Sequence, residues 1–196
     1  AKNSKYITDI VVTTDSPHIK IIAKQMRVKC KWRDERLCAD DVTLDAVIDD
    51  AIDKNIQWDY IVTMQPTSPT LMTSTLDKAI EYAIKNKLDT LISAINSPHL
   101  SWKEKDGVKV PAYKERLNRQ YLPANYLETG AFVISKADIV TPDTRIGKKV
   151  DVFEISENEA VDVDTFLDLK VVSDILNVKK VAIYVNGNNE RGMGHI

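Results

Sequence analysis

Short runs of hydrophobic residues alternate along this chain with longer segments in which hydrophobic residues recur every three or four positions. The short runs are rich in β-branched and aromatic residues and end in polar residues, which predicts strands that open onto loops. The expected strand and helix pairs are 7–15 with 16–26, 28–32 with 43–55, and 58–64 with 74–87. Strands that alternate with helices of this length are typical of a parallel sheet with right-handed crossovers. The predicted class is therefore α/β.

The alternation changes after a fourth predicted strand at 88–96. Residues 97–126 mix Pro, Lys, Trp and Tyr without a clear period, which indicates a hairpin-rich insertion. Strands are expected again at 127–135 and 149–155, and the last helix at 165–176. The run VAIYV in 179–196 then leads into a glycine-containing loop and looks like the start of a second α/β domain, so we expect a first domain at 1–178.

Composition excludes several classes of partner. The chain has 27 Lys and Arg against 29 Asp and Glu, so it carries no basic field that would concentrate nucleic acid or an anionic membrane. No apolar run approaches the roughly 20 residues that span a bilayer, and the first residues lack the hydrophobic core of a signal peptide. We expect a cytoplasmic protein, with Cys30 and Cys38 as reduced thiols and with His18 and His99 at the surface.

Polar loops follow the predicted strands, and in a parallel α/β sheet ligands bind where such loops gather. The loop QPTSP (65–69) holds an amide and two hydroxyls between two prolines that stiffen the backbone. It could present Gln65, Thr67 and Ser68 to a polyhydroxylated ligand. Equally, it could be a connection whose hydroxyls only cap the backbone.

Two earlier loops offer charged candidates. Arg33 begins RDERLCADD (33–41) and could hold a phosphate or a carboxylate with two hydrogen bonds, whereas the acidic residues after it could form a solvated helix start. Asp15 follows the first strand and could contact a ligand, or could only introduce the helix cap at Ser16. The residues alone leave both questions open.

The stretch AVDVDTFLDL (160–169) places two carboxylates together. Side chains alternate faces in an extended segment, so Asp162 and Asp164 share one face and repel each other unless a cation lies between them. Paired carboxylate oxygens suit Mg²⁺, which takes further ligands from water and phosphate. The alternative is that Asp164 caps a helix beginning at Thr165 and that Asp162 is merely solvated. Asp168 lies one helical turn beyond and is expected to point away.

Six segments in this order carry a resemblance to a known family. They are VVTTDS (11–16), RDERLCADD (33–41), QPTSP (65–69), RQYLP (119–123), ETGAFVIS (128–135) and AVDVDTFLDL (160–169). Together they resemble the cytidylyltransferases that activate sialic acids, the CMP-N-acetylneuraminate synthetases. The resemblance covers about residues 5–176. It implies a Rossmann-like nucleotidyltransferase fold with a mostly parallel sheet flanked by helices, and a homodimer built on a small dimerisation insertion at about 97–126.

The reaction implied by the resemblance joins CTP and a sialic-acid-like nonulosonic acid to give a CMP-sugar and pyrophosphate. The family's Mg²⁺-binding and catalytic aspartates correspond to Asp162 and Asp164. The residues that correspond to the sugar site are Gln65, Thr67, Ser68, Arg119 and Gln120, and those that correspond to the nucleotide site are Asp15, Arg33 and Asp40. A cytidylyltransferase for the eight-carbon keto sugar of lipopolysaccharide, and a non-catalytic sugar- or nucleotide-binding module, are the alternatives.

The chain also departs from the family pattern. Thr70 and Leu71 stand where Leu-Arg usually follows QPTSP, and Phe166 stands where Glu is common. The family's glycine- and lysine-rich phosphate loop is expected about 30 residues upstream of residue 1, so we expect this 196-residue chain by itself to bind CTP poorly and to turn over little. The end at 179–196 resembles the first strand and loop of UDP-sugar hydrolases of pseudaminic-acid biosynthesis.

Overall fold

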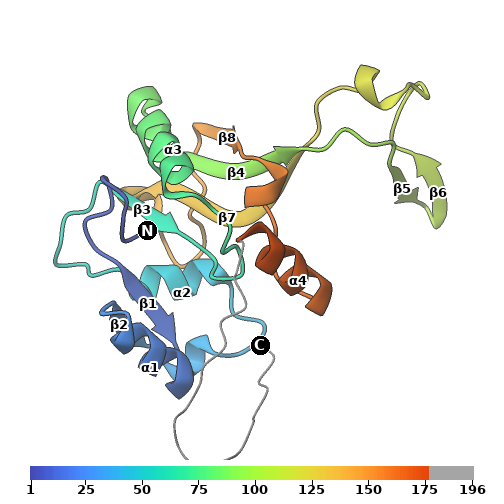
Figure 1. The fold of residues 1–196 in the computed structure, drawn as a ribbon. Coiled ribbons are helices and arrows are strands. Elements are labelled where there is room, and N and C mark those ends of the chain that lie inside the picture. Colours follow the sequence, from blue (N-terminus) through green and yellow to red (C-terminus); the bar gives the residue numbers. More distant parts are fainter. Residues whose placement is uncertain (177–196) are drawn as a thin grey trace, which may run out of the picture.

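The computed structural model describes residues 1–176, which form an α/β body from which one long arm projects (Figure 1). The helices are α1 (Pro17–Gln25), α2 (Leu44–Ala51), α3 (Thr73–Asn86) and α4 (Phe166–Ile175). The strands are β1 (Val11–Thr14), β2 (Lys29–Trp32), β3 (Tyr60–Thr63), β4 (Thr90–Asn96), β5 (Trp102–Lys105), β6 (Val108–Pro111), β7 (Tyr126–Lys136) and β8 (Val150–Glu154). All the predicted strand and helix pairs are present, and the predicted second domain at 179–196 lies outside the described residues.

The main sheet is mixed, whereas the sequence predicts a mostly parallel one. Its strand order is β3-β7-β4-β8, and β7 runs antiparallel to both of its neighbours, while β4 and β8 are parallel. The reason is the connection between β4 and β7. It leaves and returns as an arm rather than crossing over through a helix, so the two strands pair as in a wide hairpin. Strands β1 and β2 form a separate parallel pair.

Helix α3 supplies most of one side of the core. Its buried residues Leu76, Ala79, Ile80 and Ala83 follow the three- and four-residue spacing of one helical face. They pack against the central strands, and the rest of the buried cluster is Leu88, Leu91, Ala131, Phe132, Ile134 and Ile155. The first five residues of β4 are buried because β4 lies between β7 and β8 in the sheet. The core therefore fixes the strands whose ends carry the polar loops.

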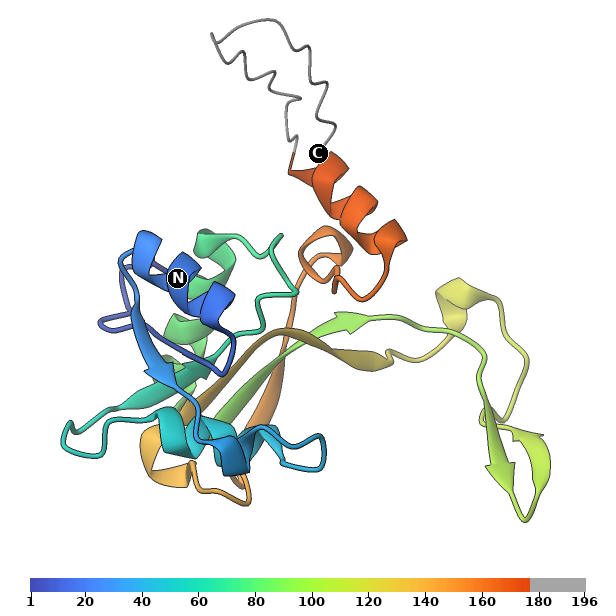
Figure 2. The ribbon, with the colours of Figure 1, turned by 90° about the horizontal axis from the view of Figure 1, so that it is seen from below.

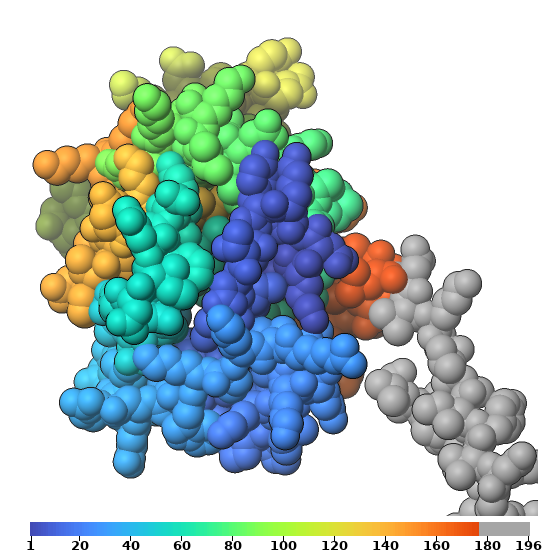
Figure 3. All heavy atoms as spheres, turned by 90° about the vertical axis from the view of Figure 1, so that its left-hand side faces the viewer, coloured from blue at the N-terminus to red at the C-terminus, as the bar shows by residue number. Residues whose placement is uncertain are grey.

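The lobe of β1, α1 and β2 is joined to the body by the N-terminal segment, which Figure 3 shows between the lobe and the region of α3. The Ser4 hydroxyl donates to Asp77 in α3, and Lys29 in β2 pairs with Asp9 at 2.6 Å. Within the lobe, Ser16 caps α1 and a proline occupies its first position, as the sequence predicts.

The arm is the predicted insertion, and Figure 2 shows it reaching away from the body. Strands β5 and β6 form a hairpin closed by Asp106 and Gly107, which both have positive φ, the requirement of a tight two-residue turn. Trp102, Val108 and Tyr121 on the arm are each more than half exposed. The arm thus presents large apolar side chains away from the core.

Other composition-based expectations can be compared with residues 1–176. Cys30 and Cys38 are both free thiols, and His18 and His99 are exposed, as predicted. Within this part of the chain, none of the helices combines the length and the apolar character that crossing a bilayer requires.

Candidate functional site

A β-bulge in β7 creates the geometry of the site. Ile92 of β4 pairs with Val133, but Ala94 pairs with Glu128, so residues 129–132 of β7 lie opposite the single residue Ser93. Ser93 is fully buried. Its hydroxyl donates to the Phe132 carbonyl at 2.9 Å and accepts from the Phe132 N–H at 3.0 Å. Bulges redirect a strand locally, and this one takes Thr129 and Gly130 out of the regular ladder, while Glu128 stays paired with Ala94.

Gly130, at the bulge, is the point where three of the sequence motifs meet. Its carbonyl accepts a hydrogen bond from the Gln65 N–H at 3.3 Å. A methyl carbon built on Gly130 would overlap the Gln65 Oε1 atom and would lie 3.4 Å from Asp162 Oδ2. The side chains of Gln65 and Asp162, which come from QPTSP and AVDVDT, therefore converge over this glycine. Only a residue without a side chain leaves room for both.

The QPTSP loop is joined directly to the acidic segment, because the Thr67 carbonyl accepts from the Val163 N–H at 2.9 Å. Gln65 and Thr67 are exposed, whereas Ser68 is buried and its hydroxyl has no hydrogen-bond partner among residues 1–176. One form of the alternative, in which these hydroxyls only cap the backbone, would place a cap at the next helix. The N-cap of α3 is Met72, and it receives no side-chain cap from the loop.

The two aspartates of AVDVDTFLDL differ in their surroundings. Asp162 is half-buried, and its Oδ1 atom is buried without a hydrogen-bond partner in the described part of the chain. Asp164 is exposed. The alternative that Asp164 caps the last helix is wrong: Thr165 is the N-cap of α4. Asp168 completes a capping box by accepting from the Thr165 N–H at 2.8 Å, and hydrogen bonds from Thr165 lower the pKa of Asp168.

The unpartnered carboxylate oxygen of Asp162 fits a hard divalent cation. A buried carboxylate oxygen without a partner is costly unless a ligand satisfies it, and oxygen is the donor that Mg²⁺ prefers. Within residues 1–176 no group of three or more His, Cys, Asp or Glu side chains is placed to hold a metal. A cation at Asp162 and Asp164 would therefore take its other ligands from water and from substrate oxygens.

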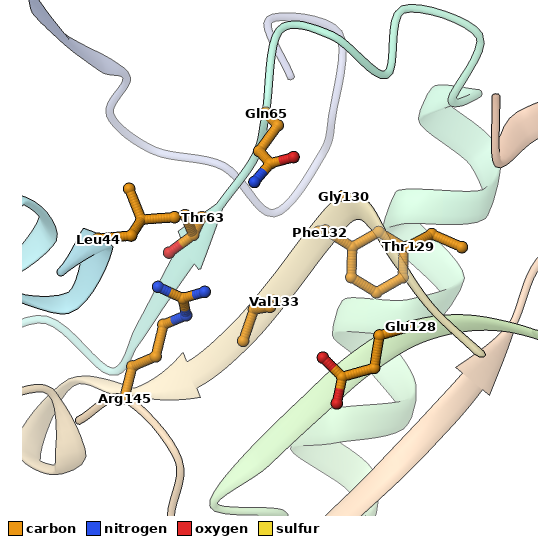
Figure 4. A pocket seen from close by; sticks show the side chains of 9 residues that line it. All are labelled: Leu44, Thr63, Gln65, Glu128, Thr129, Gly130, Phe132, Val133 and Arg145. Atoms are coloured by element: carbon orange, nitrogen blue, oxygen red, sulfur yellow. The ribbon is translucent and has the colours of Figure 1, made fainter. Parts of the chain in front are cut away.

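A cavity of about 250 Å³ opens beside Gln65 (Figure 4). Its lining consists of Leu44, Thr63, Gln65, Glu128, Thr129, Gly130, Phe132, Val133 and Arg145. Figure 4 shows the Glu128 carboxylate and the Arg145 guanidinium entering from different sides of the cavity. Arg145 is held by Asp45 of α2 at 2.9 Å, and its carbonyl accepts from the Ser135 hydroxyl at 2.7 Å. The cavity is mixed in character: the Glu128 carboxylate and the Arg145 guanidinium carry opposite charges, and Leu44 and Val133 are among its apolar lining residues.

Sequence reasoning missed Arg145 and did not single out Glu128. Glu128 stands in the segment ETG (128–130), one of the segments that carry the family resemblance, and that was the available signal. Arg145 lies in a polar loop with no period and no motif, so only the tertiary fold reveals it.

Two of the three predicted nucleotide residues, Asp15 and Arg33, form a second group in the loops after β1 and β2. The backbone N–H of Arg33 donates to the Thr14 carbonyl at 3.0 Å, and its guanidinium donates to the Thr13 carbonyl at 3.2 Å. Cys38 lies near Asp15: burial first, and then the Asp15 charge, raise the pKa of the Cys38 thiol. The structure thus brings Asp15 and Arg33 together.

Three predicted site residues stand apart from both groups. Asp40 is exposed in the turn that precedes α2. Arg119 and Gln120 are exposed in a short 3₁₀ helix, η2 (Arg119–Tyr121), which lies on the projecting arm (Figure 2). In a single chain the arm carries these two residues away from Gln65 and Asp162.

Comparison with known proteins gives one family and several relatives. A family model described as cytidylyltransferase matches residues 1–189. The chain is 29% identical over 193 residues to post-translational flagellin modification protein B of Campylobacter coli, covering 92% of this chain and 82% of that protein. It is 27% identical over 194 residues to CMP-N,N'-diacetyllegionaminic acid synthase of Campylobacter jejuni, covering 93% and 83%. It is 25% identical over 178 residues to N-acylneuraminate cytidylyltransferase A of Danio rerio, covering 87% and 41%.

Solved structures resemble the fold at low sequence identity. A 4-diphosphocytidyl-2C-methyl-D-erythritol synthase from Anaerococcus prevotii superposes with a TM-score of 0.65 at 15% identity, over 90% of this chain and 82% of that one. A CMP:2-keto-3-deoxy-manno-octonic acid synthetase complexed with CTP superposes with a TM-score of 0.61 at 11% identity, over 90% and 84%. These likenesses confirm the predicted nucleotidyltransferase fold.

Proposed function

The chain belongs to the cytidylyltransferase family, and we propose that it joins CTP and a nonulosonic acid, a nine-carbon sugar acid related to sialic acid, to give a CMP-sugar and pyrophosphate. Two of its relatives are named as a CMP-legionaminic acid synthase and an N-acylneuraminate cytidylyltransferase, which favours a nine-carbon acceptor over the eight-carbon one. The observation that carries the proposal is the convergence of Gln65 and Asp162 over Gly130, where Asp162 keeps a buried oxygen without a partner among residues 1–176.

In this reaction the anomeric hydroxyl of the sugar loses its proton and attacks the α-phosphorus of CTP. The bond from the α-phosphorus to the oxygen that bridges it to the β-phosphorus breaks, and pyrophosphate leaves with that oxygen. The chain's own residues have to bind and orient the two substrates. We assign Arg33, Asp15 and Asp40 to the nucleotide, and Gln65 and the Thr67 hydroxyl to the hydroxyl and amide groups of the sugar. We place Ser68 with the sugar site as well, at the buried side of the same loop, because its side chain is buried.

Asp162 and Asp164 are the residues that would hold Mg²⁺. When bound, the ion would offset the negative charge of the phosphoryl oxygens, which is the chemistry that phosphoryl transfer needs most. The unpartnered Oδ1 of Asp162 is the observation in favour of this role.

The cavity beside Gln65 is our candidate for the sugar. At about 250 Å³ it is smaller than the roughly 300–1,000 Å³ of most ligand pockets, which suits a sugar better than a whole nucleotide. Glu128 can accept hydrogen bonds from sugar hydroxyls, and Arg145 can donate to an acidic or carbonyl group, although Asp45 already balances its charge. The mainly polar lining suits the hydroxyl and amide groups of a sugar.

We further propose that the protein is a homodimer and that the arm is its dimerisation insertion. Trp102, Val108 and Tyr121 support this proposal, because they are exposed apolar side chains on a projecting arm and a partner subunit would bury them. Arg119 and Gln120 on the arm would then meet the sugar bound at the partner's site.

The test is pyrophosphate release by the full-length protein with CTP, Mg²⁺ and a panel of acceptors. The panel contains N-acetylneuraminic, legionaminic and pseudaminic acids and the eight-carbon keto sugar of lipopolysaccharide. We expect turnover with a nine-carbon acid and none in the variant Asp162→Asn. Turnover with the eight-carbon sugar alone would replace the proposed substrate, and binding without turnover would indicate a binding module instead of an enzyme.

A further inference from the structure

Glu159 is the only ionisable side chain that is buried among residues 1–176, with an exposed fraction of 6%. It ends the short 3₁₀ helix η4 (Glu157–Glu159), which directly precedes the acidic motif. Burying a carboxylate is costly unless hydrogen bonds replace its water. Neither the sequence motifs nor the proposed chemistry gives this residue a role.

The hydrogen bonds of Glu159 reach a distant part of the chain. Its Oε1 atom accepts from the Met72 N–H at 3.1 Å, and its Oε2 atom accepts from the Ser156 hydroxyl at 2.9 Å. Burial by itself raises the pKa of Glu159, but hydrogen bonds from Thr75, Met72 and Ser156 outweigh it, so the pKa lies below its usual value and the group is a carboxylate. Met72 is the N-cap of α3 and has no capping side chain of its own, so Glu159 supplies a negative charge to that helix start.

A second tie lies on the other side of Asp162. The Val163 N–H donates to the Thr67 carbonyl at 2.9 Å. The segment 159–163 is therefore fastened at both ends to the segment 67–72, which follows Gln65. Asp162 stands between the two ties, so its distance from Gln65 across Gly130 depends on both of them.

We infer that Glu159 is a positioning residue, which holds Asp162 in the place where its free carboxylate oxygen can bind a divalent cation. The inference rests on the proposed function for the identity of the ligand, but the tie itself does not depend on it. Residues that orient a metal ligand without contacting the metal commonly lower the affinity for the metal 10- to 100-fold when they are removed. Loss of Glu159 should therefore weaken cation binding more than it weakens CTP binding.

The experiment compares Glu159→Ala and Glu159→Gln with the wild type in the full-length protein. Cation affinity is measured by calorimetric titration with Mn²⁺ and Mg²⁺, and the fastening of the segment is measured by amide hydrogen exchange at Val163. We expect Glu159→Ala to weaken cation binding about tenfold or more and to speed exchange at Val163. Because glutamine keeps one acceptor for the Met72 N–H, Glu159→Gln should recover most of both losses.

Asp89→Asn is the matched control. Asp89 is another carboxylate that accepts from two backbone N–H groups, those of Lys148 and Lys149, but it lies at the start of β4 and not beside the acidic motif. We expect this variant to melt at a lower temperature with unchanged cation affinity and unchanged exchange at Val163. If Glu159→Ala only lowers the melting temperature in the same way, the positioning role is wrong. If the wild type binds the cation but releases no pyrophosphate, the proposed function fails while the positioning role stands.

Discussion

Gly130→Ala tests whether Gln65 contacts the sugar, and it does so without changing Gln65 itself. A methyl group at Gly130 would overlap Gln65 Oε1 and would lie 3.0 Å from Gln65 Cδ. Gly130 does not have a positive φ, so alanine adds no backbone strain there. Gln65 is exposed and flexible and can rotate away at a cost of about 0.5–1.5 kcal/mol. The fold should thus survive while the amide leaves its position.

The expected loss is that of one hydrogen bond to the substrate. Such a bond contributes about 0.5–1.5 kcal/mol net, which corresponds to about a two- to tenfold rise in the KM for the sugar. The KM for CTP should stay unchanged. The assay is pyrophosphate release at varied sugar concentration, together with a thermal melt that should shift by only a few degrees.

Two further variants make the test sharper. Gln65→Ala should reproduce the rise in KM, and the double variant should add nothing, because both substitutions remove the same contact. Gly147→Ala is the matched control: its methyl group would overlap Asp89 Cβ, which no side-chain rotation can move away, so it should lower stability and leave KM unchanged. An unchanged KM in Gly130→Ala, or additive effects in the double variant, would refute the reasoning.

Four other expectations follow from the same contacts. Ser93→Ala leaves groups of the bulge without their partner and should cost about 1–3 kcal/mol in chemical denaturation. The pKa of Asp89 is lowered to about 2, first by its hydrogen bond to the Lys136 side chain and then by hydrogen bonds from backbone N–H groups. The stability that this carboxylate contributes is therefore complete above the unfolded pKa near 4 and is lost as the pH falls toward 2. Asp89→Asn should flatten that part of the curve of unfolding free energy against pH. Mixing inactive Arg119→Ala with inactive Asp162→Asn should restore up to about a quarter of the active sites if the arm serves the partner, and none if it serves its own chain. Asp162→Asn should weaken Mn²⁺ binding more than Asp164→Asn in a titration, because only Asp162 has a buried oxygen without a partner among residues 1–176.

The elements of this fold are predictable from sequence because their causes are local. Ser16 and the proline after it start α1 through contacts within one turn, and the helical spacing in α3 identifies its buried face directly. Strand direction is different. β7 was expected in a mostly parallel sheet, but its antiparallel pairing depends on the path of residues 97–126, which no local period encodes. The start of α3 also depends on a distant residue, because the carboxylate that accepts from the Met72 N–H is that of Glu159, 87 positions away in the chain.

The candidate site also has features that the sequence predicts and features that only the fold determines. The two-residue period of AVDVDT treats Asp162 and Asp164 as equivalent, and no argument from spacing can separate them. In the structure the two aspartates differ, because different parts of the fold hold them. Asp162 is fixed to the body through Val163, whereas the Asp164 N–H donates to Asp168, a member of the capping box that begins α4. The motif is therefore also a junction: the Asp162 side is tied to the QPTSP loop through the Val163 N–H, and the Asp164 N–H belongs to the start of α4.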